Sequence, residues 1–293
     1  MRAWHWLRRN AISVFAGVAI VYLLLPIALI AVFSFNDPDG KYNYTWNGFT
    51  TEYWSDMFAL EALNEAMLTS LQLAAITTVI SLILGTMIAL ALVRHQFFGR
   101  RAANLLIVIP MATPEVVIGA ALLSLFVNFS VTLGFTTLVI AHVMFSISFV
   151  VIVVRSRLIG FDRSLEEAGR DLGASPWTTF RTITLPLLAP GLVGAGLLAF
   201  ALSIDDFVIS DFNSGQTETF PLYIFSGLSK GIPVQVYVLA TLLFLVTVVA
   251  MGLVTWQQKR AEQMAAVRPD DETTGLAALA SGGDPVARAG STS

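Results

Sequence analysis

The sequence has 293 residues, of which 56% are hydrophobic and only 13% are charged, with a mean hydropathy of +0.74. This composition excludes an ordinary water-soluble globular domain and indicates a membrane protein. The absence of cysteine excludes disulfides and thiolate metal sites, and the formal net charge of −3 says little about partners.

Six apolar stretches are each long enough to cross about 30 Å of hydrocarbon at about 1.5 Å per residue. They are residues 11–33, 66–93, 102–127, 133–154, 187–210 and 236–256. The first is longer than a signal-peptide core and no small-residue cleavage site follows it, so we expect it to be retained. We therefore predict a short N-terminus (1–10), a six-span membrane domain (11–257) and a tail (258–293) without apolar periodicity, which we expect to be disordered.

Positive charges are distributed unevenly among the connections. Fifteen of the 17 Lys and Arg residues fall in the N-terminus, the second-to-third connection, the fourth-to-fifth connection and the tail. The remaining three connections hold only Lys41 and Lys230. Because Lys and Arg concentrate on the cytoplasmic side of membrane proteins, we predict that both termini and the connection 155–186 are cytoplasmic.

The first outer connection, residues 36–65, is rich in Asn, Gly and aromatic residues. Most of these aromatic residues are typical of the belt that lies at the lipid headgroups. Trp54 is our candidate for a residue at the mouth where a substrate enters.

The third apolar stretch contains Pro110 and Pro114, which remove backbone donors and predict a weakened or broken helix. Broken helices at membrane depth usually line a cavity. Glu115 follows directly, and a carboxylate in an apolar run is costly unless it faces the protein interior or water. We therefore place Glu115 in a substrate path.

The fourth stretch contains His142, with Ser146 and Ser148 on the following turns. No acidic residue, Cys or second His stands near it at ligand spacing. We therefore expect a hydrogen-bonded packing histidine rather than a metal or catalytic site.

A polar segment, residues 167–186, separates the fourth and fifth stretches. Ser164 and Glu167 form a capping-box pattern that predicts a short helix from Leu165, and Gly173 to Pro176 predicts a turn. A second short helix over 177–184 should follow, and Leu185-Pro186 should mark the point where the chain turns into the next span. This helix-turn-helix on the membrane surface would suit docking against a soluble partner.

Seven positions of this segment align in register with the fixed positions of the pattern E-A-A-x3-G-x9-I-x-L-P; six match it, and Gly169 stands where the pattern has alanine. The seven positions are Glu167, Ala168, Gly169, Gly173, Ile183, Leu185 and Pro186. On these residues the chain resembles the permease subunits of binding-protein-dependent ABC importers. The glycine loosens one helical turn by roughly 1 kcal/mol, which should not abolish docking.

The resemblance implies an all-α integral membrane protein with the type I ABC importer permease fold and six transmembrane helices. It further implies that the loop is a coupling helix that sits in a cleft of the ATP-hydrolysing subunit. Arg170, Asp171 and Ala174, which lie between the matched positions, are assigned to the same contact.

The fifth stretch has a small-residue face, Gly191, Gly194 and Gly196, suited to close helix packing. Ser203, Asp205 and Asp206 follow. At about 1.5 Å per residue, the aspartates and Glu115 should lie at comparable heights in the outer half of the membrane. Alternatively, the aspartates simply end the span at the outer interface, although the apolar run continues beyond them.

Three longer stretches, 33–54, 156–175 and 202–215, are similar to permeases of spermidine and putrescine importers. That likeness implies a polyamine cargo, with Asp205 and Asp206 as the Asp-Asp of a Ser-x-Asp-Asp pattern. A polyamine carries several ammonium groups, so spaced carboxylates such as Glu115 and an aromatic face such as Trp54 would suit its path.

The chain has no Gly-x4-Gly-Lys-Ser/Thr phosphate loop, so we expect no ATP site, no cofactor and no catalytic residue in it. The family implies a second six-span permease, two ATPase subunits that bind ATP and Mg, and an extracytoplasmic polyamine-binding protein. The expected setting is the lipid of the bacterial inner membrane, crossed several times, with no nucleic-acid partner and no metal.

Three alternatives remain open from the sequence. The same fold could carry another cargo, such as ferric ion or a thiamine-like cation. The chain could be a secondary transporter that works alone. An intramembrane hydrolase would need a nucleophile and a base, but Ser124, Ser146 and Ser148 have no orienting carboxylate nearby in sequence.

Overall fold

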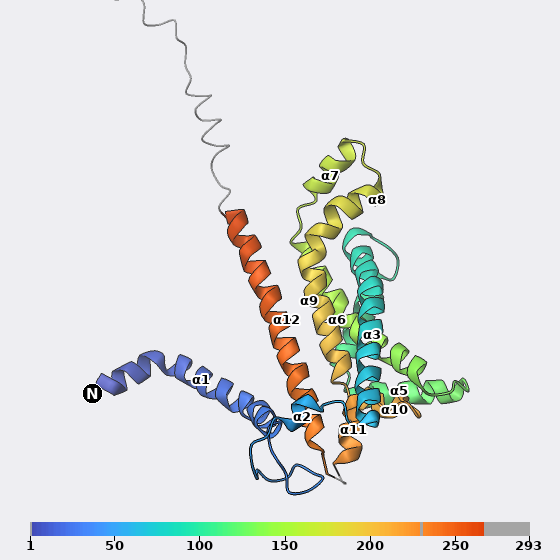
Figure 1. Ribbon diagram of the computed structural model, residues 1–293. Helices are drawn as coiled ribbons and strands as arrows, with labels where there is room; N and C mark the ends of the chain where they lie inside the picture. The colour runs from blue at the N-terminus through green and yellow to red at the C-terminus, as the bar shows by residue number, and fades with distance from the viewer. Residues whose placement is uncertain (1, 229–230, 267–293) are drawn as a thin grey trace, which may run out of the picture. The chain divides into compact units, whose positions relative to one another are not determined.

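The regular structure of this protein is helical. The computed structural model describes residues 2–228 and 231–266, and the only β-structure in these residues is an isolated antiparallel bridge between Asn36 and Phe49 (Figure 1). The predicted all-α class is confirmed. Contacts group the described residues into two units, one up to Thr241 and the other from Leu242.

Long helices follow the apolar stretches, because a helix satisfies its backbone groups within the segment when lipid offers no hydrogen bonds. Short helices occupy the polar connections. In chain order they are α1 (Arg2–Phe33), α2 (Glu52–Ser55), α3 (Glu61–Arg94), α4 (Arg100–Ala112), α5 (Glu115–Asn128), α6 (Phe135–Ile159), α7 (Ser164–Asp171), α8 (Pro176–Thr179), a π-helical turn (Phe180–Thr184), α9 (Leu185–Ile204), α10 (Val208–Asn213), α11 (Phe220–Gly227) and α12 (Val234–Ala266).

Within the described residues, five helical segments are long and apolar enough to cross a membrane, or six if α4 and α5 count as one broken span. The five are Asn10–Phe33, Glu61–Arg94, Phe135–Ile159, Pro176–Ile204 and Val234–Gln257. Each overlaps one of the predicted apolar stretches. The helices extend further than those stretches at both ends of the chain, since α1 begins at Arg2 and α12 runs to Ala266. The predicted disorder of the tail is therefore wrong for residues 258–266, and 267–293 lie outside the described residues.

The break predicted in the third stretch is present, and it lies at one proline rather than two. α4 runs through Pro110 and ends at Ala112, and α5 begins at Glu115 at an angle of 111° to it. Thr113 is extended, with φ −87° and ψ 134°, as expected of a residue that precedes proline. Pro114 therefore sets the bend that brings Glu115 to the start of a new helix.

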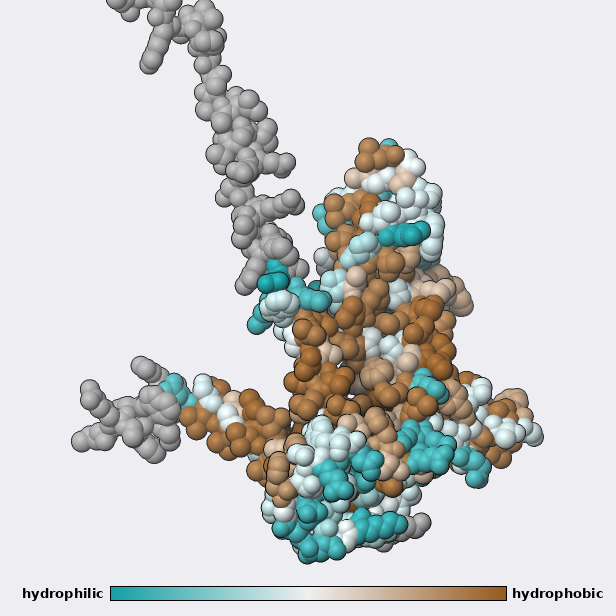
Figure 2. Space-filling view, viewed as in Figure 1, coloured by the Kyte–Doolittle hydropathy of each residue, from teal (hydrophilic) through white to brown (hydrophobic). Residues whose placement is uncertain are grey.

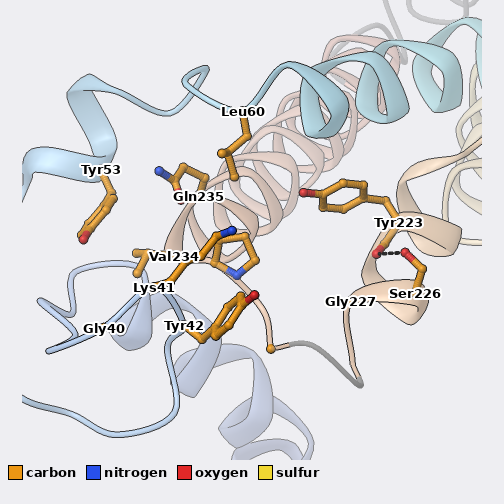
Figure 3. A pocket seen from close by; sticks show the side chains of 12 residues that line it. Gly40, Lys41, Tyr42, Tyr53, Leu60, Tyr223, Ser226, Gly227, Val234 and Gln235 are labelled. Carbon is orange, nitrogen blue, oxygen red and sulfur yellow. Dashed lines mark hydrogen bonds between the residues drawn. The ribbon is translucent and has the colours of Figure 1, made fainter.

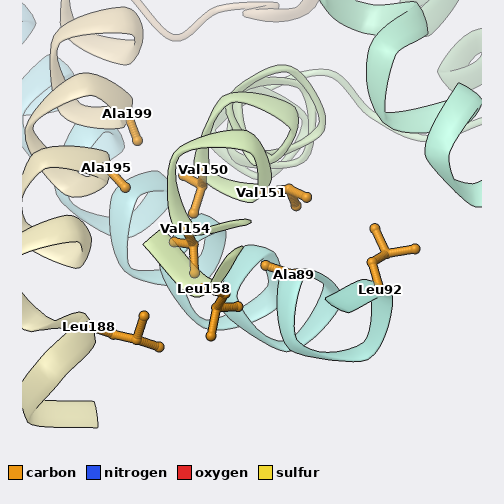
Figure 4. Packing of buried hydrophobic residues seen from close by; sticks show 9 residues of the cluster. All are labelled: Ala89, Leu92, Val150, Val151, Val154, Leu158, Leu188, Ala195 and Ala199. Atoms are coloured by element: carbon orange, nitrogen blue, oxygen red, sulfur yellow. The ribbon is translucent and has the colours of Figure 1, made fainter. Parts of the chain in front are cut away.

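The largest core cluster joins α3, α6 and α9 (Figure 4). Its buried members are Ala89, Leu92, Val150, Val151, Val154, Leu158, Leu188, Ala195 and Ala199. Small residues let these helices approach closely: a Cβ added at Gly85 would lie 2.6 Å from Cγ1 of Val150, and one at Gly191 would lie 2.6 Å from Cγ of Arg157.

Apolar side chains also cover much of the outer surface of the bundle. On α3, Leu68, Val79, Ile83 and Met87 are all more than half exposed. In Figure 2 brown residues extend along the long helices, and teal residues gather on the connections near α11. A water-soluble monomer rarely exposes so large a patch, so lipid or another subunit must cover it.

The connection between α1 and α2 is folded on itself. Asn36 is fully buried, and its Nδ2 donates to Oδ1 of Asn43 at 2.6 Å and to the carbonyl of Thr45 at 2.6 Å. The ring of Phe35 stacks on Phe49 at 5.5 Å and on Trp54 at 5.2 Å between centroids. This connection also reaches the start of α12, since the N–H of Asn43 donates to the carbonyl of Ile232 at 3.1 Å.

Candidate functional site

Residues 164–186, here called the docking segment, form two short helices joined by a tight turn. Gly173 has φ +85°, which favours glycine, and Ser175 caps α8 by accepting the N–H of Thr178 at 3.2 Å. The predicted turn is thus confirmed. Pro176 starts α8, where its missing N–H costs nothing.

The predicted capping box is wrong. α7 begins at Ser164 rather than Leu165, and the Ser164 side chain makes no cap hydrogen bond. Instead the N–H of Ser164 donates to Oδ1 of Asp162 at 2.9 Å, and the N–H groups of Glu166 and Glu167 donate to the carbonyl of Arg163. Hydrogen bonds from Ser164 hold the pKa of the exposed Asp162 carboxyl below its usual value.

The chain changes direction between α8 and α9 (Figure 1), but it does so without leaving helical structure at Leu185-Pro186. α8, the π-helical turn and α9 follow one another without interruption as a single helical segment, Pro176–Ile204. The N–H of Leu185 donates to the carbonyl of Phe180, one residue further back than in an α-helix. Pro186 then falls in the first turn of α9, where the helix tolerates it.

The outer face of the docking segment carries exposed polar and apolar side chains. Glu167, Arg170 and Asp171 are exposed on α7. Leu172 and Trp177, on either side of the turn, are 90% and 68% exposed. Among the other residues assigned to this contact, Ala168, Gly173, Leu185 and Pro186 are exposed and Gly169, Ala174 and Ile183 are partly buried.

The inner face of the docking segment is tied to the bundle by a residue that the sequence analysis did not single out. Glu166 is 4% exposed and pairs with Arg94, the last residue of α3. The same oxygen of Glu166 accepts the hydroxyl of Thr184. Arg163 adds a hydrogen bond to the carbonyl of Val93 at 3.1 Å. In the sequence Glu166 and Glu167 are adjacent at the start of a short helix, and nothing in that pattern indicates that Glu166 points into the bundle.

A second group of polar residues surrounds the junction of α9 and α10. α9 ends at Ile204 and α10 starts at Val208, so the predicted continuous stretch 187–210 is interrupted at residues 205–207, here called the acidic break. Asp205 is exposed there, whereas Asp206 is 8% exposed. The two neighbouring carboxylates therefore have different surroundings.

Asp206 is held by hydrogen bonds from the start of α10. Its Oδ1 accepts the N–H of Ile209 at 3.3 Å, and its Oδ2 accepts the N–H of Ser210 at 3.0 Å and the Ser210 hydroxyl at 3.3 Å. These bonds satisfy free N–H groups of α10, which also favours a negative charge at that end.

His142 connects α6 to both sides of the acidic break. Its Nδ1 lies 2.8 Å from Oγ of Ser203, and its Nε2 lies 3.0 Å from Oγ of Ser210 and 3.3 Å from Oδ2 of Asp206. Its ring is buried, as expected of a packing histidine. The carboxylate of Asp206 does accompany it, but from the acidic break 64 positions further along the chain, so sequence spacing could not show it.

Glu115 approaches the acidic break from α5. It is the first residue of α5, is exposed, and lies close enough to Asp206 to interact with it electrostatically. α5 packs on α10: a Cβ added at Gly119 would lie 2.8 Å from the ring of Phe212, and Nδ2 of Asn213 donates to the carbonyl of Gly119 at 3.3 Å.

The structure thus brings together four of the five residues predicted to line a substrate path, Glu115, Ser203, Asp205 and Asp206. Trp54 lies instead in α2, where its ring stacks on Phe35. In the described residues, no hydrogen bond or aromatic contact joins Trp54 to the carboxylates. The same residues contain no group of three or more His, Asp or Glu side chains placed to hold a metal ion.

A pocket of about 450 Å³ lies beside the α1–α2 connection, where α11 and the start of α12 meet it (Figure 3). Tyr42, Tyr53 and Tyr223 line it together with Lys41 and Gln235. The pocket does not include any residue of the acidic break.

The family described as "Binding-protein-dependent transport system inner membrane component" matches residues 81–263. The chain is 38% identical over 251 residues to the spermidine/putrescine transport system permease protein PotC of Haemophilus influenzae, covering 85% of this chain and 95% of that protein. It is 36% identical over 255 residues to the putrescine transport system permease protein PotI of Escherichia coli K12, covering 84% and 90%.

Two solved structures show a similar fold. One is a chain of a bacterial ABC transporter involved in the import of the acidic polysaccharide alginate, with a TM-score of 0.62, 17% identity and coverage of 86% of this chain and 96% of that chain. The other is a chain of the inward-facing MetNI methionine ABC transporter, with a TM-score of 0.50, 17% identity and coverage of 73% and 98%.

Proposed function

Because the chain belongs to the family of binding-protein-dependent transport system inner membrane components, and is thus a non-catalytic, multi-pass subunit of a bacterial inner-membrane importer, we propose that its cargo is a polyamine, spermidine or putrescine. The acidic break carries this proposal. Glu115 and Asp205 are exposed carboxylates at the ends of two interrupted helices. A carboxylate at such a position is costly in lipid unless a path for water or a cation passes it.

The similar proteins support the same cargo. Both transport-system permeases at 36% and 38% identity bear names that include putrescine, and one also includes spermidine. A flexible polycation needs several separate negative charges along its route. Glu115 and Asp205 lie on different helices and would meet different ammonium groups.

We propose six spans, with α4 and α5 together as the third, and both termini in the cytoplasm. The excess of Lys and Arg in the N-terminus, the inner connections and the tail supports this orientation. The docking segment then faces the cytoplasm, where an ATPase would be. No phosphate loop occurs in the sequence, so two partner ATPase subunits would bind ATP and Mg.

Two further partners complete the proposed importer. A second six-span permease would cover part of the exposed apolar surface and form the other half of the path. An extracytoplasmic binding protein would deliver the polyamine to the end of the bundle that carries the α1–α2 connection and α11. The family's own description names dependence on a binding protein.

The helical connections suggest how force reaches the cargo. α7 would bind the ATPase through its exposed face, while Glu166 ties it to Arg94 on α3 and Thr184 at the foot of α9. The docking segment continues into α9 without a break in helical structure, and the 20 residues of α9 end directly before Asp205. Movement of the docking segment would therefore be transmitted along about 30 Å of helix to the acidic break.

A transport assay in membrane vesicles tests the cargo. Vesicles containing the whole importer should take up labelled putrescine or spermidine only when ATP and the binding protein are supplied, and excess ferric ion should not compete. Asp205→Asn should reduce this uptake at unchanged permease abundance, since it removes one exposed charge. Wild-type uptake by Asp205→Asn, or competition by ferric ion alone, would contradict the polyamine assignment.

The hydrolase alternative finds no support in the geometry around His142. The ring does contact Ser203 and Ser210, but these serines are 3% and 0% exposed. A nucleophile has to be reached by its substrate, so the contacts indicate a structural network.

A further inference from the structure

The network around His142 spans the acidic break, and its two sides come from different helices. Ser203 is in the last turn of α9 and Ser210 is in α10. One imidazole ring on α6 contacts both, with Nδ1 2.8 Å from Oγ of Ser203 and Nε2 3.0 Å from Oγ of Ser210. The ring therefore fixes the position of α10 relative to the end of α9.

A single arrangement of protons satisfies the whole network. The Ser203 hydroxyl can donate to Nδ1, the Nε2–H can donate to Oγ of Ser210 at 3.0 Å, and the Ser210 hydroxyl donates to Oδ2 of Asp206 at 3.3 Å. Asp206 then accepts two backbone N–H groups and the Ser210 hydroxyl, and Nε2 of the imidazole lies 3.3 Å from its Oδ2. With both oxygens bonded and the residue 8% exposed, Asp206 has little capacity left to bind a cargo ammonium.

Asp205 is in the opposite situation. It is exposed, and no side-chain hydrogen bond to it is present among residues 2–228 and 231–266. An ammonium group that reaches the acidic break therefore finds a free carboxylate at Asp205. The carboxylate of Asp206 already accepts hydrogen bonds from the start of α10.

We propose that His142 is a positioning residue. By holding Ser203, Ser210 and Asp206 in place, it makes Asp206 the cap of α10 and leaves Asp205 as the carboxylate that binds the cargo. This inference rests on the proposed polyamine import. It assigns different roles to two adjacent aspartates, and it gives a transport role to a histidine that contacts no cargo. Phe145 of α6 and Ile209 of α10 belong to one buried apolar cluster, with Leu202 of α9 packed against it, so the three helices that carry the network also share apolar contacts.

The test measures cargo discrimination, which does not depend on how much permease is present. Vesicles with the whole importer and the wild-type binding protein would receive an equal mixture of labelled spermidine and putrescine, and the ratio of the two uptake rates would be recorded. Spermidine carries one more positive charge than putrescine, so loss of an exposed carboxylate should disfavour spermidine more. A charge contact of about 1.4 kcal/mol corresponds to about a tenfold change in ratio.

The variants isolate each role. Asp205→Asn should lower the spermidine-to-putrescine ratio several-fold, and His142→Ala should shift it in the same direction, because the ring no longer orients the break. His142→Gln keeps a donor near the Nε2 position and should recover most of the wild-type ratio. Ser146→Ala is the matched control, because Ser146 is buried on the same helix as His142 and its Oγ has no hydrogen-bond partner in the described residues. The spermidine-to-putrescine ratio of this variant should equal that of the wild type.

Each result decides one question. If His142→Ala lowers both uptakes equally, the residue is only structural and the inference fails. If His142→Ala does not accumulate, the double variant Ser203→Ala/Ser210→Ala takes its place, with the same two outcomes. If Asp206→Asn shifts the ratio and Asp205→Asn does not, the assigned roles are reversed. Failure of the wild-type importer to take up either polyamine would instead overturn the proposed function.

Discussion

Arg94, at the C-terminal end of α3, forms an ion pair with the buried Glu166 of α7. This pair joins the surface helix that we propose docks the ATPase to one of the three helices in the largest core cluster. Because Glu166 also accepts the hydroxyl of Thr184, one carboxylate links α3, α7 and the foot of α9.

Arg94→Ala should destabilise the permease, because it leaves the Glu166 carboxylate buried without a cation. We expect a loss of about 2 kcal/mol, below the range for fully buried pairs, since the Arg94 side chain is 22% exposed. The double variant Arg94→Ala/Glu166→Gln removes the unpaired charge and should recover part of the loss. Thermal unfolding of the purified importer measures both, and equal melting temperatures for the two variants would argue against a buried charge.

Glu167→Arg should release the ATPase or uncouple hydrolysis from transport without lowering the amount of permease. Glu167 is exposed on α7, so its replacement disturbs a partner rather than the fold. Co-purification of the ATPase with the tagged permease is the measurement. Glu65→Arg is the control, because Glu65 is an exposed glutamate near the opposite end of α3. Equal ATPase recovery from both variants would refute the docking assignment.

Gly169→Ala tests the one departure from the family pattern. Alanine should gain about 1 kcal/mol of helix propensity. The added Cβ would lie 2.7 Å from Cδ1 of Ile183, however, so that the gain is offset. Replacing Ile183 by Val removes this methyl group. We therefore expect Gly169→Ala to be nearly neutral in the wild type and clearly stabilising in an Ile183→Val background, as judged by melting temperature. An identical effect in both backgrounds would show that the contact is irrelevant.

Gly85→Ala should destabilise the bundle where α3 meets α6. The new Cβ would lie 2.6 Å from Cγ1 and 2.9 Å from Cβ of Val150, a branched side chain with little freedom to move. Overpacking of this kind costs about 1–3 kcal/mol. The double variant Gly85→Ala/Val150→Ala should unfold at a higher temperature than Gly85→Ala despite the loss of two methyl groups. Gly194→Ala, where the structure has open space, is the control.

Local chemistry was enough to predict much of this fold. Hydropathy located the membrane helices, and the backbone donors missing at Pro110 and Pro114 predicted a broken helix in the third stretch, although not which proline would break it. The cost of a carboxylate in an apolar run pointed to Glu115, Asp205 and Asp206 as a group, and the structure places them near one another. The turn at Gly173 followed from glycine's tolerance of a positive φ.

What the sequence could not show depends on contacts between distant segments. The acidic break contains neither Pro nor Gly, and it arises because Asp206 caps α10 while His142 on α6 holds both sides. The proline at 186 suggested a turn, but the π-helical turn shifts the hydrogen bonds and lets the helix continue. From the sequence alone Glu166 would be taken for an exposed surface charge, because its partner Arg94 is distant in sequence and is brought to it only by tertiary packing.

Because α8 continues into α9 without a break in helical structure, the direction in which Asp205 points around the helix axis depends on the number of residues between it and α8. Each residue of an α-helix turns the chain by about 100°, so one extra alanine inserted in α9 would rotate the carboxylate toward a different neighbour while leaving composition and hydropathy almost unchanged. An insertion of seven residues would nearly restore the original direction but shift the carboxylate by about 10 Å along the axis. Direction and height of the acidic group can thus be altered separately.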